Sequence, residues 1–238
     1  MDKSEGNQSI PEVLYHTTLT VVEYHRHSCG STRDVYALGT HTTMPAAKES
    51  AHSALEHLGY QADDFLDYAA RLETPSEQWK HGDAVLVYAK DPRGREFLVG
   101  IGTAPNTDSL EAGTGDKVLL PEGHDHLHYV MKRMINYSQD RCGAFHTCEI
   151  LGCYLKRDDA LVAAKAALDA DHVEYAQYDE RKDGEADGGW PFGEEVVVHA
   201  VGQTGENYTV AVTTVQTARN KHGKAQRSKA KSAGPGSK

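Results

Sequence analysis

The chain has 238 residues, with 25 Lys and Arg against 35 Asp and Glu, so its formal net charge is −10. Hydrophobic residues make up 39% and charged residues 25%, which excludes a fibrous or collagen-like protein. No apolar run approaches the roughly 20 residues of a membrane helix, and the polar N-terminus lacks the apolar stretch of a secretory signal. We therefore expect a cytoplasmic or nuclear protein, neither secreted nor membrane-bound, whose four cysteines stay reduced.

The two halves of the chain repeat one another. A shift of 113 residues aligns the first part of each half without a gap, and a shift of 111 aligns the rest. The recurring residues belong to an apolar core and its turns: Leu14/Leu127, Tyr24/Tyr137, Cys29/Cys142, Gly30/Gly143, Leu38/Leu151, Ala47/Ala160, Ala51/Ala164, Leu55/Leu168, Trp79/Trp190 and Val99/Val210. The repeat predicts two similar domains rather than a solenoid, whose repeats are shorter and more numerous.

Each half begins with two predicted strands. Residues 17–25 are rich in β-branched side chains, and their copy is residues 130–138. A turn follows at Cys29-Gly30, where glycine permits the positive φ of a hairpin bend. Residues 34–40 then form the second strand, copied by residues 147–153.

A helix comes next in each half. Thr43 suits its N-cap, and Pro45 suits its first turn. The buried stripe has helical spacing, with Ala at three positions that permit close packing on a sheet: Ala47, Ala51, Ala54, Leu55 and Leu58. Residues 63–72 predict a second helix, whose counterpart around residues 175–181 is shorter and more polar.

Two more strands close each half. Residues 84–90 and 96–102 flank the turn Asp91-Pro92-Arg93-Gly94, and the second half repeats this pattern. The predicted fold class is α+β, a tandem duplication of a β-β-α-β-β unit. Each unit is a four-stranded, largely antiparallel sheet with a helix on one face, and the two pack as a pseudo-dimer. Trp79 and Trp190, which precede the third strand of each unit, are expected to be largely buried.

These patterns divide the chain into five segments. They are a flexible N-terminus at 1–13, a first unit at 14–105, a linker at 106–126, a second unit at 127–217 and a disordered basic tail at 218–238. We expect the protein to be a monomeric pseudo-dimer or a homodimer.

The last twenty residues carry seven basic side chains and no acidic one, so the other 218 residues carry −17. The candidate binding residues in this tail are Arg219, Lys221, Lys224, Arg227, Lys229 and Lys231. One interpretation is a solvated tail that folds back on the acidic body. The other is a nuclear-import or nucleic-acid-binding patch.

Two groups of residues resemble metal ligands. His124, His126 and His128 would project to one side of an extended strand, which suits a transition metal. The second group is Cys142, His146, Cys148 and Cys153. Strand periodicity puts Cys148 and Cys153 on opposite faces, so they would not share an ion. We expect neither a metal nor another cofactor, and keep the three histidines as a weak candidate.

Acid–base candidates lie beyond the first strand of each unit: Tyr24, His25 and His27, with Tyr137 and Asp140 in the second unit. The residues shared by both units are folding residues, and no known catalytic motif is present. The favoured hypothesis is a non-enzymatic binding or adaptor protein that engages a protein or nucleoprotein partner through its sheet faces or inter-unit groove. The alternative is a small-molecule enzyme with its site between the units.

Overall fold

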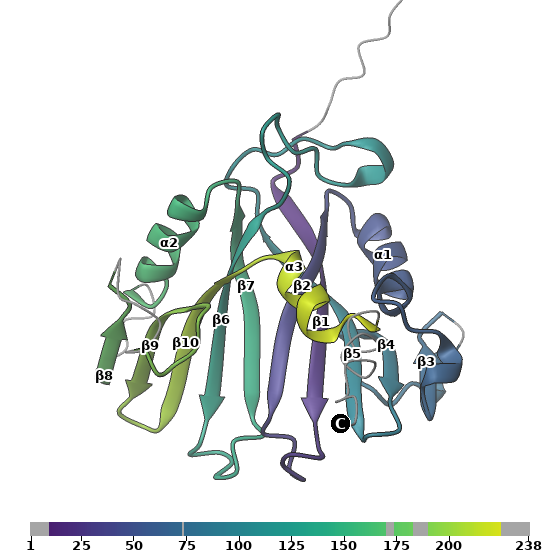
Figure 1. The fold of residues 1–238 in the computed structure, drawn as a ribbon, viewed down its shortest axis with the longest axis horizontal. Helices are drawn as coiled ribbons and strands as arrows, with labels where there is room; N and C mark the ends of the chain where they lie inside the picture. Colours follow the sequence, from purple (N-terminus) through teal and green to yellow (C-terminus); the bar gives the residue numbers. More distant parts are fainter. Residues whose placement is uncertain (1–9, 73, 170–173, 183–189, 225–238) are drawn as a thin grey trace, which may run out of the picture.

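The strands of each half form their own antiparallel sheet (Figure 1). The computed structural model describes residues 10–72, 74–169, 174–182 and 190–224. The strands of the first sheet, in the spatial order β2-β1-β5-β4-β3, are β1 (Val13–Glu23), β2 (Arg33–His41), β3 (Asp67–Ala70), β4 (Val85–Lys90) and β5 (Arg95–Pro105). Helix α1 (Met44–His57) follows β2, and the Thr43 hydroxyl accepts a hydrogen bond from the Ala46 amide as its N-cap.

The second sheet has the same strand order, β7-β6-β10-β9-β8. Its strands are β6 (His128–Asn136), β7 (His146–Tyr154), β8 (Tyr175–Glu180), β9 (Val196–Gly202) and β10 (Glu206–Thr213). The helices that follow β7 and β10 are α2 (Arg157–Ala166) and α3 (Val215–His222). Single turns of 3₁₀-helix occupy Ala62–Asp64, Ser76–Gln78 and Thr114–Asp116.

Irregularities of the two sheets recur at equivalent positions. The β1–β2 ladder shifts register between Thr17 and Thr18, and the β6–β7 ladder shifts between Val130 and Met131, 113 residues later. A bulge re-aims the side chains that follow it and is a specific feature of a fold. The predicted α+β architecture with two similar units is therefore confirmed.

The prediction of four strands per unit is wrong, because each sheet has five. Residues 63–72 are not a helix: Asp67–Ala70 forms β3 and pairs with β4. Likewise, residues 175–181 supply β8 and not a short helix. A helix would need Leu66 and Leu72 on its buried face, yet they are 73% and 81% exposed. Pairing also satisfies the backbone groups at the edge of β4, which outweighs the helical spacing.

Three apolar cores hold these layers together. The first core lies between the first sheet and α1, and it includes Leu19, Phe97 and Leu55. The second core is its equivalent between the second sheet and α2. The shared core lies between the two sheets and combines residues of both halves: Leu14, Ala37, Ala104, Leu110, Leu127, Tyr129, Met131, Ile150 and Cys153. Each sheet thus packs on its own helix with one face and on the other unit with the opposite face.

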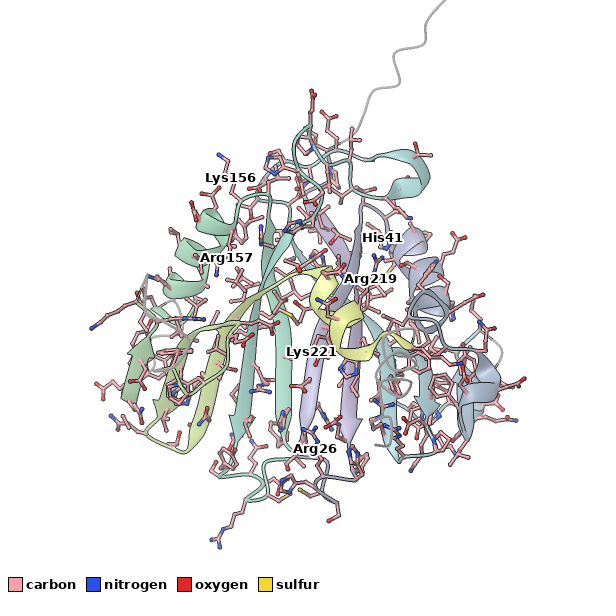
Figure 2. The ribbon with its side chains drawn as sticks, in the orientation of Figure 1. Arg26, His41, Lys156, Arg157, Arg219 and Lys221 are labelled. Atoms are coloured by element: carbon pink, nitrogen blue, oxygen red, sulfur yellow. The ribbon has the colours of Figure 1, made fainter. Side chains whose placement is uncertain are left out.

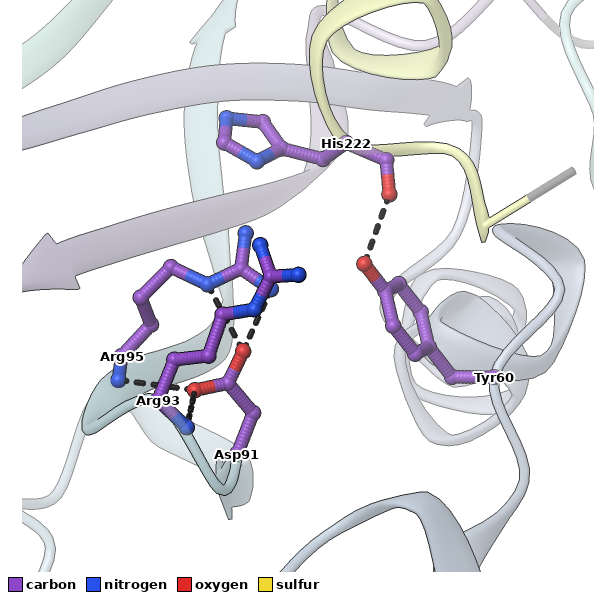
Figure 3. A network of polar contacts seen from close by, with 5 residues as sticks. All are labelled: Tyr60, Asp91, Arg93, Arg95 and His222. Carbon is purple, nitrogen blue, oxygen red and sulfur yellow. Dashed lines mark hydrogen bonds and ion pairs between the residues drawn. The ribbon is translucent and has the colours of Figure 1, made fainter. Parts of the chain in front are cut away.

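Helix α3 belongs to the second half of the chain but packs on the first unit (Figure 1). Ala218 is fully buried in the first core, and the His222 ring lies against Tyr36. The Tyr60 hydroxyl donates a 2.9 Å hydrogen bond to the His222 carbonyl, as Figure 3 shows. The expected start of a disordered tail at residue 218 is therefore wrong, because a small buried side chain and these contacts order the chain through Lys224. Residues 225–238 lie outside the described part.

A buried ion pair closes the β4–β5 hairpin (Figure 3). The Arg95 guanidinium donates two hydrogen bonds to Asp91 Oδ2, and the amides of Arg93 and Arg95 donate to Asp91 Oδ1 at 2.9 Å. Burial alone would raise the pKa of Asp91, but the hydrogen bonds and charge of Arg95 outweigh it and lower that pKa. The equivalent turn of the second unit, Gly202-Gln203-Thr204-Gly205, has no such pair.

The two tryptophans are half-buried, so the expectation that they are largely buried is wrong. Trp79 packs edge-on to His81, which stacks on Tyr88 with ring centroids 3.9 Å apart. In the second unit, Trp190 packs edge-on to Phe192, which stacks on His199 at 3.8 Å. The recurring tryptophan therefore covers a pair of stacked rings instead of filling an apolar core.

Replacing Asp91 tests the buried pair. Asp91→Ala leaves the Arg95 charge buried without its partner, so the free energy of unfolding should fall by roughly 3–5 kcal/mol in denaturant titration. Lys90→Ala, which removes the neighbouring and more exposed ion pair with Glu96, is the matched control and should cost at most about 1 kcal/mol. Equal effects of the two variants would contradict this assignment.

Shortening the chain tests the role of α3. A chain that ends at Ala218 loses His222 and Lys224, whereas a chain that ends at Lys224 keeps both. We expect the shorter chain to be less stable by roughly 2–4 kcal/mol, since it loses a buried ring contact and several hydrogen bonds. Identical melting temperatures for the two chains would show that these contacts contribute nothing.

Candidate functional site

Two equivalent grooves lie where the sheets meet. The larger, about 530 Å³, is bounded by Thr18, Thr20 and Gly100 of the first sheet and by β7 of the second. The smaller, about 360 Å³, is bounded by Thr209 and Ala211 of the second sheet and by β2 of the first. In each case, the edge strand of one unit covers the sheet face of the other.

Charged groups at these grooves are paired between the units. Arg133 lies 3.8 Å from Asp34 and donates a 3.3 Å hydrogen bond to the Arg33 carbonyl. Lys221 of α3 lies 3.3 Å from Glu195 and 5.7 Å from the centre of the Tyr36 ring. The charges therefore join the two units across the grooves.

A third cavity, which we call the inter-unit cleft, is lined by residues of both units, of the linker and of α3. Its volume is about 420 Å³. Its walls come from β2, α1, the linker, the start of β6 and α3. Its lining is mixed, and seven of the seventeen lining residues are aliphatic: Leu38, Ala54, Leu58, Val118, Leu120, Leu127 and Val215. Such a volume lies within the range of small-ligand sites.

His41 lies in the wall of the inter-unit cleft at the end of β2. It is 4% exposed, and neither ring nitrogen has a hydrogen-bond partner among the described residues. Its Nε2 lies 3.5 Å from the position that a Cβ would take at Gly39, so the ring folds over this glycine. Burial lowers the pKa of His41, and the charge of Lys117 lowers it further. The ring is an unsatisfied polar group beside an open cavity.

Two cations stand at the rim of this cleft, and they come from different segments. Lys117 belongs to the linker, which pairs with β2 through an isolated bridge between His41 and Lys117. Arg219 belongs to α3 and lines the same cavity as His41; both residues are labelled in Figure 2. Neither cation forms an ion pair within the part of the chain that the structure describes. The acidic side chain at the rim, Asp125, is engaged by His126.

Behind the cleft, equivalent residues of the two units lie close together, as they do about a pseudo-two-fold axis that relates the units. A chain of hydrogen-bonded polar groups lies there. His16 Nδ1 and Thr40 Oγ1 are 2.9 Å apart, and Thr40 Oγ1 and Tyr129 Oη are also 2.9 Å apart. His16 and Tyr129 are equivalent by the 113-residue shift, and their ring centroids lie 5.7 Å apart. The pKa of the fully buried His16 falls to about 4, first through desolvation and then through His41.

The chain was compared with protein-family models, with curated proteins and with solved structures, and nothing matched in any of the three comparisons. The site is therefore interpreted from its own chemistry.

The five acid–base candidates lie in two neighbouring hairpin loops. Tyr24, His25 and His27 follow β1, and Tyr137 and Asp140 follow β6. The rings of Tyr24 and Tyr137 pack over Gly30 and Gly143, each with an atom 2.8 Å from the position that a glycine Cβ would take. The three cavities described above are lined by other residues.

The parity argument for Cys148 and Cys153 is wrong. The β6–β7 ladder pairs Val130 with Gly152 and Met131 with Ile150, so Leu151 is an extra residue that reverses the alternation. Both cysteines consequently face the shared core. Within the described ranges, no three His, Cys, Asp or Glu side chains gather as metal ligands would.

The three candidate histidines do not share one strand. His124 and His126 precede β6, which begins at His128, so the strand alternation assumed for them does not apply. The rings of His126 and His128 are 4.7 Å apart and nearly perpendicular.

The candidate binding residues of the basic tail fall into three groups. Arg219 lies at the rim of the inter-unit cleft. Lys221 and Lys224 bind the acidic side chains of Glu195 and Asp64, as expected if this segment folds back on the body. Arg227, Lys229 and Lys231 lie outside the described residues.

His41, Lys117 and Tyr129 were not among the site residues predicted from the sequence. A lone histidine at a strand end and a lysine in a linker give no pattern of their own. Tyr129 occupies the position equivalent to His16, but the sequence does not show that these two positions meet in space. None of the helices described is long and apolar enough to cross a membrane.

The depressed pKa of His16 predicts a pH-dependent stability. The unfolded chain takes up this proton near pH 6.5 and the folded protein only near pH 4, so stability falls as the pH decreases between these values. The loss from His16 is roughly 3 kcal/mol. His16→Gln should flatten the curve of unfolding free energy against pH over this window. His25→Gln, on an exposed loop, is the control and should leave the curve unchanged; equal slopes for both variants would contradict the assignment.

Proposed function

We propose that this chain is a non-enzymatic binding protein whose inter-unit cleft takes a ligand with an apolar body and an anionic group. The observation that carries this proposal is the buried and unpartnered His41 ring, which lies beside a cavity rimmed by Lys117 and Arg219. This proposal keeps the non-enzymatic binder and the inter-unit groove of the favoured hypothesis, but it replaces the protein or nucleoprotein partner with a small ligand.

The walls of the cleft support an apolar ligand body. They include Leu38, Leu58, Leu120 and Val215, which come from four different segments. Filling the cavity with an apolar group would remove this surface from water at about 25 cal/mol per Å². A ligand of this size can therefore gain binding energy from the walls before any polar contact is made.

The rim supports the anionic group. Lys117 and Arg219 approach from the linker and from α3, so their charges converge although the body of the protein is acidic. An anion between them would form charge-assisted hydrogen bonds, and a planar carboxylate or sulfonate suits the guanidinium fork of Arg219. The N–H of the neutral His41 ring would gain the partner that it lacks.

The test uses a probe that combines both features. 8-Anilinonaphthalene-1-sulfonate has an apolar ring system and a sulfonate that stays ionised, and its fluorescence rises in an apolar site. N-phenyl-1-naphthylamine, which lacks the sulfonate, is the matched neutral probe. Both are titrated into the folded, full-length chain, with melting temperatures recorded for each variant.

We expect Lys117→Gln and Arg219→Gln each to weaken binding of the sulfonate about three- to tenfold, in line with the loss of one charge-assisted contact at an exposed rim. Binding of the neutral probe should not change. Lys156→Gln, an exposed lysine outside the cleft, should affect neither probe. Equal affinities for the two probes in all variants would overturn the proposal, as would a loss of affinity in Lys156→Gln equal to that in Arg219→Gln.

A further inference from the structure

The pseudo-two-fold axis brings two equivalent cysteines together at the hairpin loops. Cys29 lies in the β1–β2 loop and Cys142 in the β6–β7 loop, 113 residues apart. The Cys29 thiol donates to the Cys142 carbonyl at a distance of 3.7 Å, and each of the two thiols shifts the pKa of the other. Cys142 is exposed and Cys29 partly so.

Both loops are built to hold the cysteine in the same position. Gly30 and Gly143 have φ values of 75° and 76°, a region that favours glycine, and a tyrosine ring packs over each. Asp140 adds a further constraint in the second loop: its carboxylate accepts hydrogen bonds from the Cys142 amide at 3.0 Å and from the Cys142 thiol at 3.3 Å. The backbone of both loops, and not a single adjustable side chain, therefore brings the two cysteines close to each other.

The two thiols differ in reactivity. Interactions with Cys142 and Ser31 lower the pKa of Cys29. The interaction with Cys29 raises the pKa of Cys142 to about 11. Cys29 is consequently the better nucleophile of the pair. Burial raises the pKa of Cys148 to about 11 and that of Cys153 to about 12, so these two cysteines are poor competitors.

We propose that Cys29 and Cys142 form a redox-sensitive pair of thiols, which a peroxide oxidises to a disulfide that joins the two units. The Cys29 thiolate attacks one oxygen of hydrogen peroxide, the O–O bond breaks, and the products are a Cys29 sulfenic acid and hydroxide. The Cys142 sulfur then attacks the Cys29 sulfur, the S–O bond breaks, and the second oxygen leaves as water. In sum, two thiols and one hydrogen peroxide give one disulfide and two waters.

The location sets the consequence of this bond. It would close a chain segment of 113 residues and fix the hairpin loops of the two units to each other. A cross-link over a segment of this length restricts the unfolded chain strongly, so the oxidised protein should be markedly more stable.

The experiment is peptide mapping of the full chain without reduction. The protein is reduced, freed of reductant, treated with hydrogen peroxide, blocked with N-ethylmaleimide and digested with trypsin. Cleavage after Arg26, Arg33, Arg141 and Lys156 releases residues 27–33 and 142–156, and we expect these two peptides to be linked. Because residues 142–156 also contain Cys148 and Cys153, fragmentation of the linked peptide locates the bond.

Variants distinguish this pair from other cysteines. Cys29→Ser and Cys142→Ser should each abolish the link, and Cys148→Ser should retain it. The melting temperature should rise by roughly 5–10 °C on oxidation of the unsubstituted chain, and dithiothreitol should reverse the rise. The cysteines are exposed, so both serine variants are expected to fold, which their melting temperatures in the reduced state check.

Several results would overturn the proposal. These are an oxidised Cys29 without a bond to Cys142, a link that persists in Cys142→Ser, and disulfides that form only between molecules on a non-reducing gel. Since the loops lie outside the inter-unit cleft, probe binding to the cleft is an independent measurement.

Discussion

In each unit the helix that follows the second strand covers one face of the sheet, and the opposite face is buried on the other unit. The shared core provides this burial with side chains from β1, β2 and β5 on one side and from β6 and β7 on the other. A separate unit would expose this apolar face to water, where the loss amounts to about 25 cal/mol per Å². We therefore expect the pairing of the units to stabilise the fold, and the grooves, the cleft and the loop contact all lie where the two units meet.

Helix α3 breaks the symmetry that the duplication would otherwise impose. It leaves the second sheet, crosses to the first unit and places Ala218 in the first core. The linker also lies over the end of β2, where the Thr42 amide donates to the Asp116 carbonyl at 2.8 Å. These two asymmetric segments supply Arg219 and Lys117 to the inter-unit cleft. The two cations of the cleft thus come from parts of the chain that the two halves do not share, whereas His41 lies on β2, which has its equivalent in β7.

The sequence predicted well what depends on periodicity and repetition. The alanine stripe, the Thr43 cap and the strand pairs are local patterns, and the duplication doubled the number of observations for each. Prediction from the sequence failed where a contact between distant residues decides the structure. β3 forms because β4 offers an unpaired edge. α3 is ordered because the ring of His222 packs on Tyr36 and its carbonyl accepts a hydrogen bond from Tyr60. A bulge at Leu151 turned both Cys148 and Cys153 toward the shared core, and no property of the strand sequence indicates such an insertion.

The candidate site was harder to predict than the fold, since its groups are close in space and not in sequence. His41, Lys117 and Arg219 are separated by long stretches of chain, and each has an ordinary sequence neighbourhood. Their combination becomes visible only when the linker and α3 are placed. The grouping of Tyr24, His25 and His27 by proximity in sequence instead identified a hairpin loop.

Residues on the pseudo-two-fold axis show how burial limits the symmetry of a duplicated chain. Equivalent positions of the two halves lie in contact there. If both positions carry the same residue, its side chain must therefore be able to pack against an identical side chain. His16 Nε2 already lacks a hydrogen-bond partner among the described residues, and a second histidine at position 129 would add further buried ring nitrogens, at a cost of roughly 1–3 kcal/mol for each one left unpaired. Tyr129 instead fills this place, and its hydroxyl continues the hydrogen bonds through Thr40 to His16. At the exposed end of the axis no such penalty applies, and two thiols are mutually compatible. The same residue therefore occupies positions 29 and 142, as leucine does at the equivalent positions 14 and 127 of the shared core, where an apolar side chain needs no polar partner.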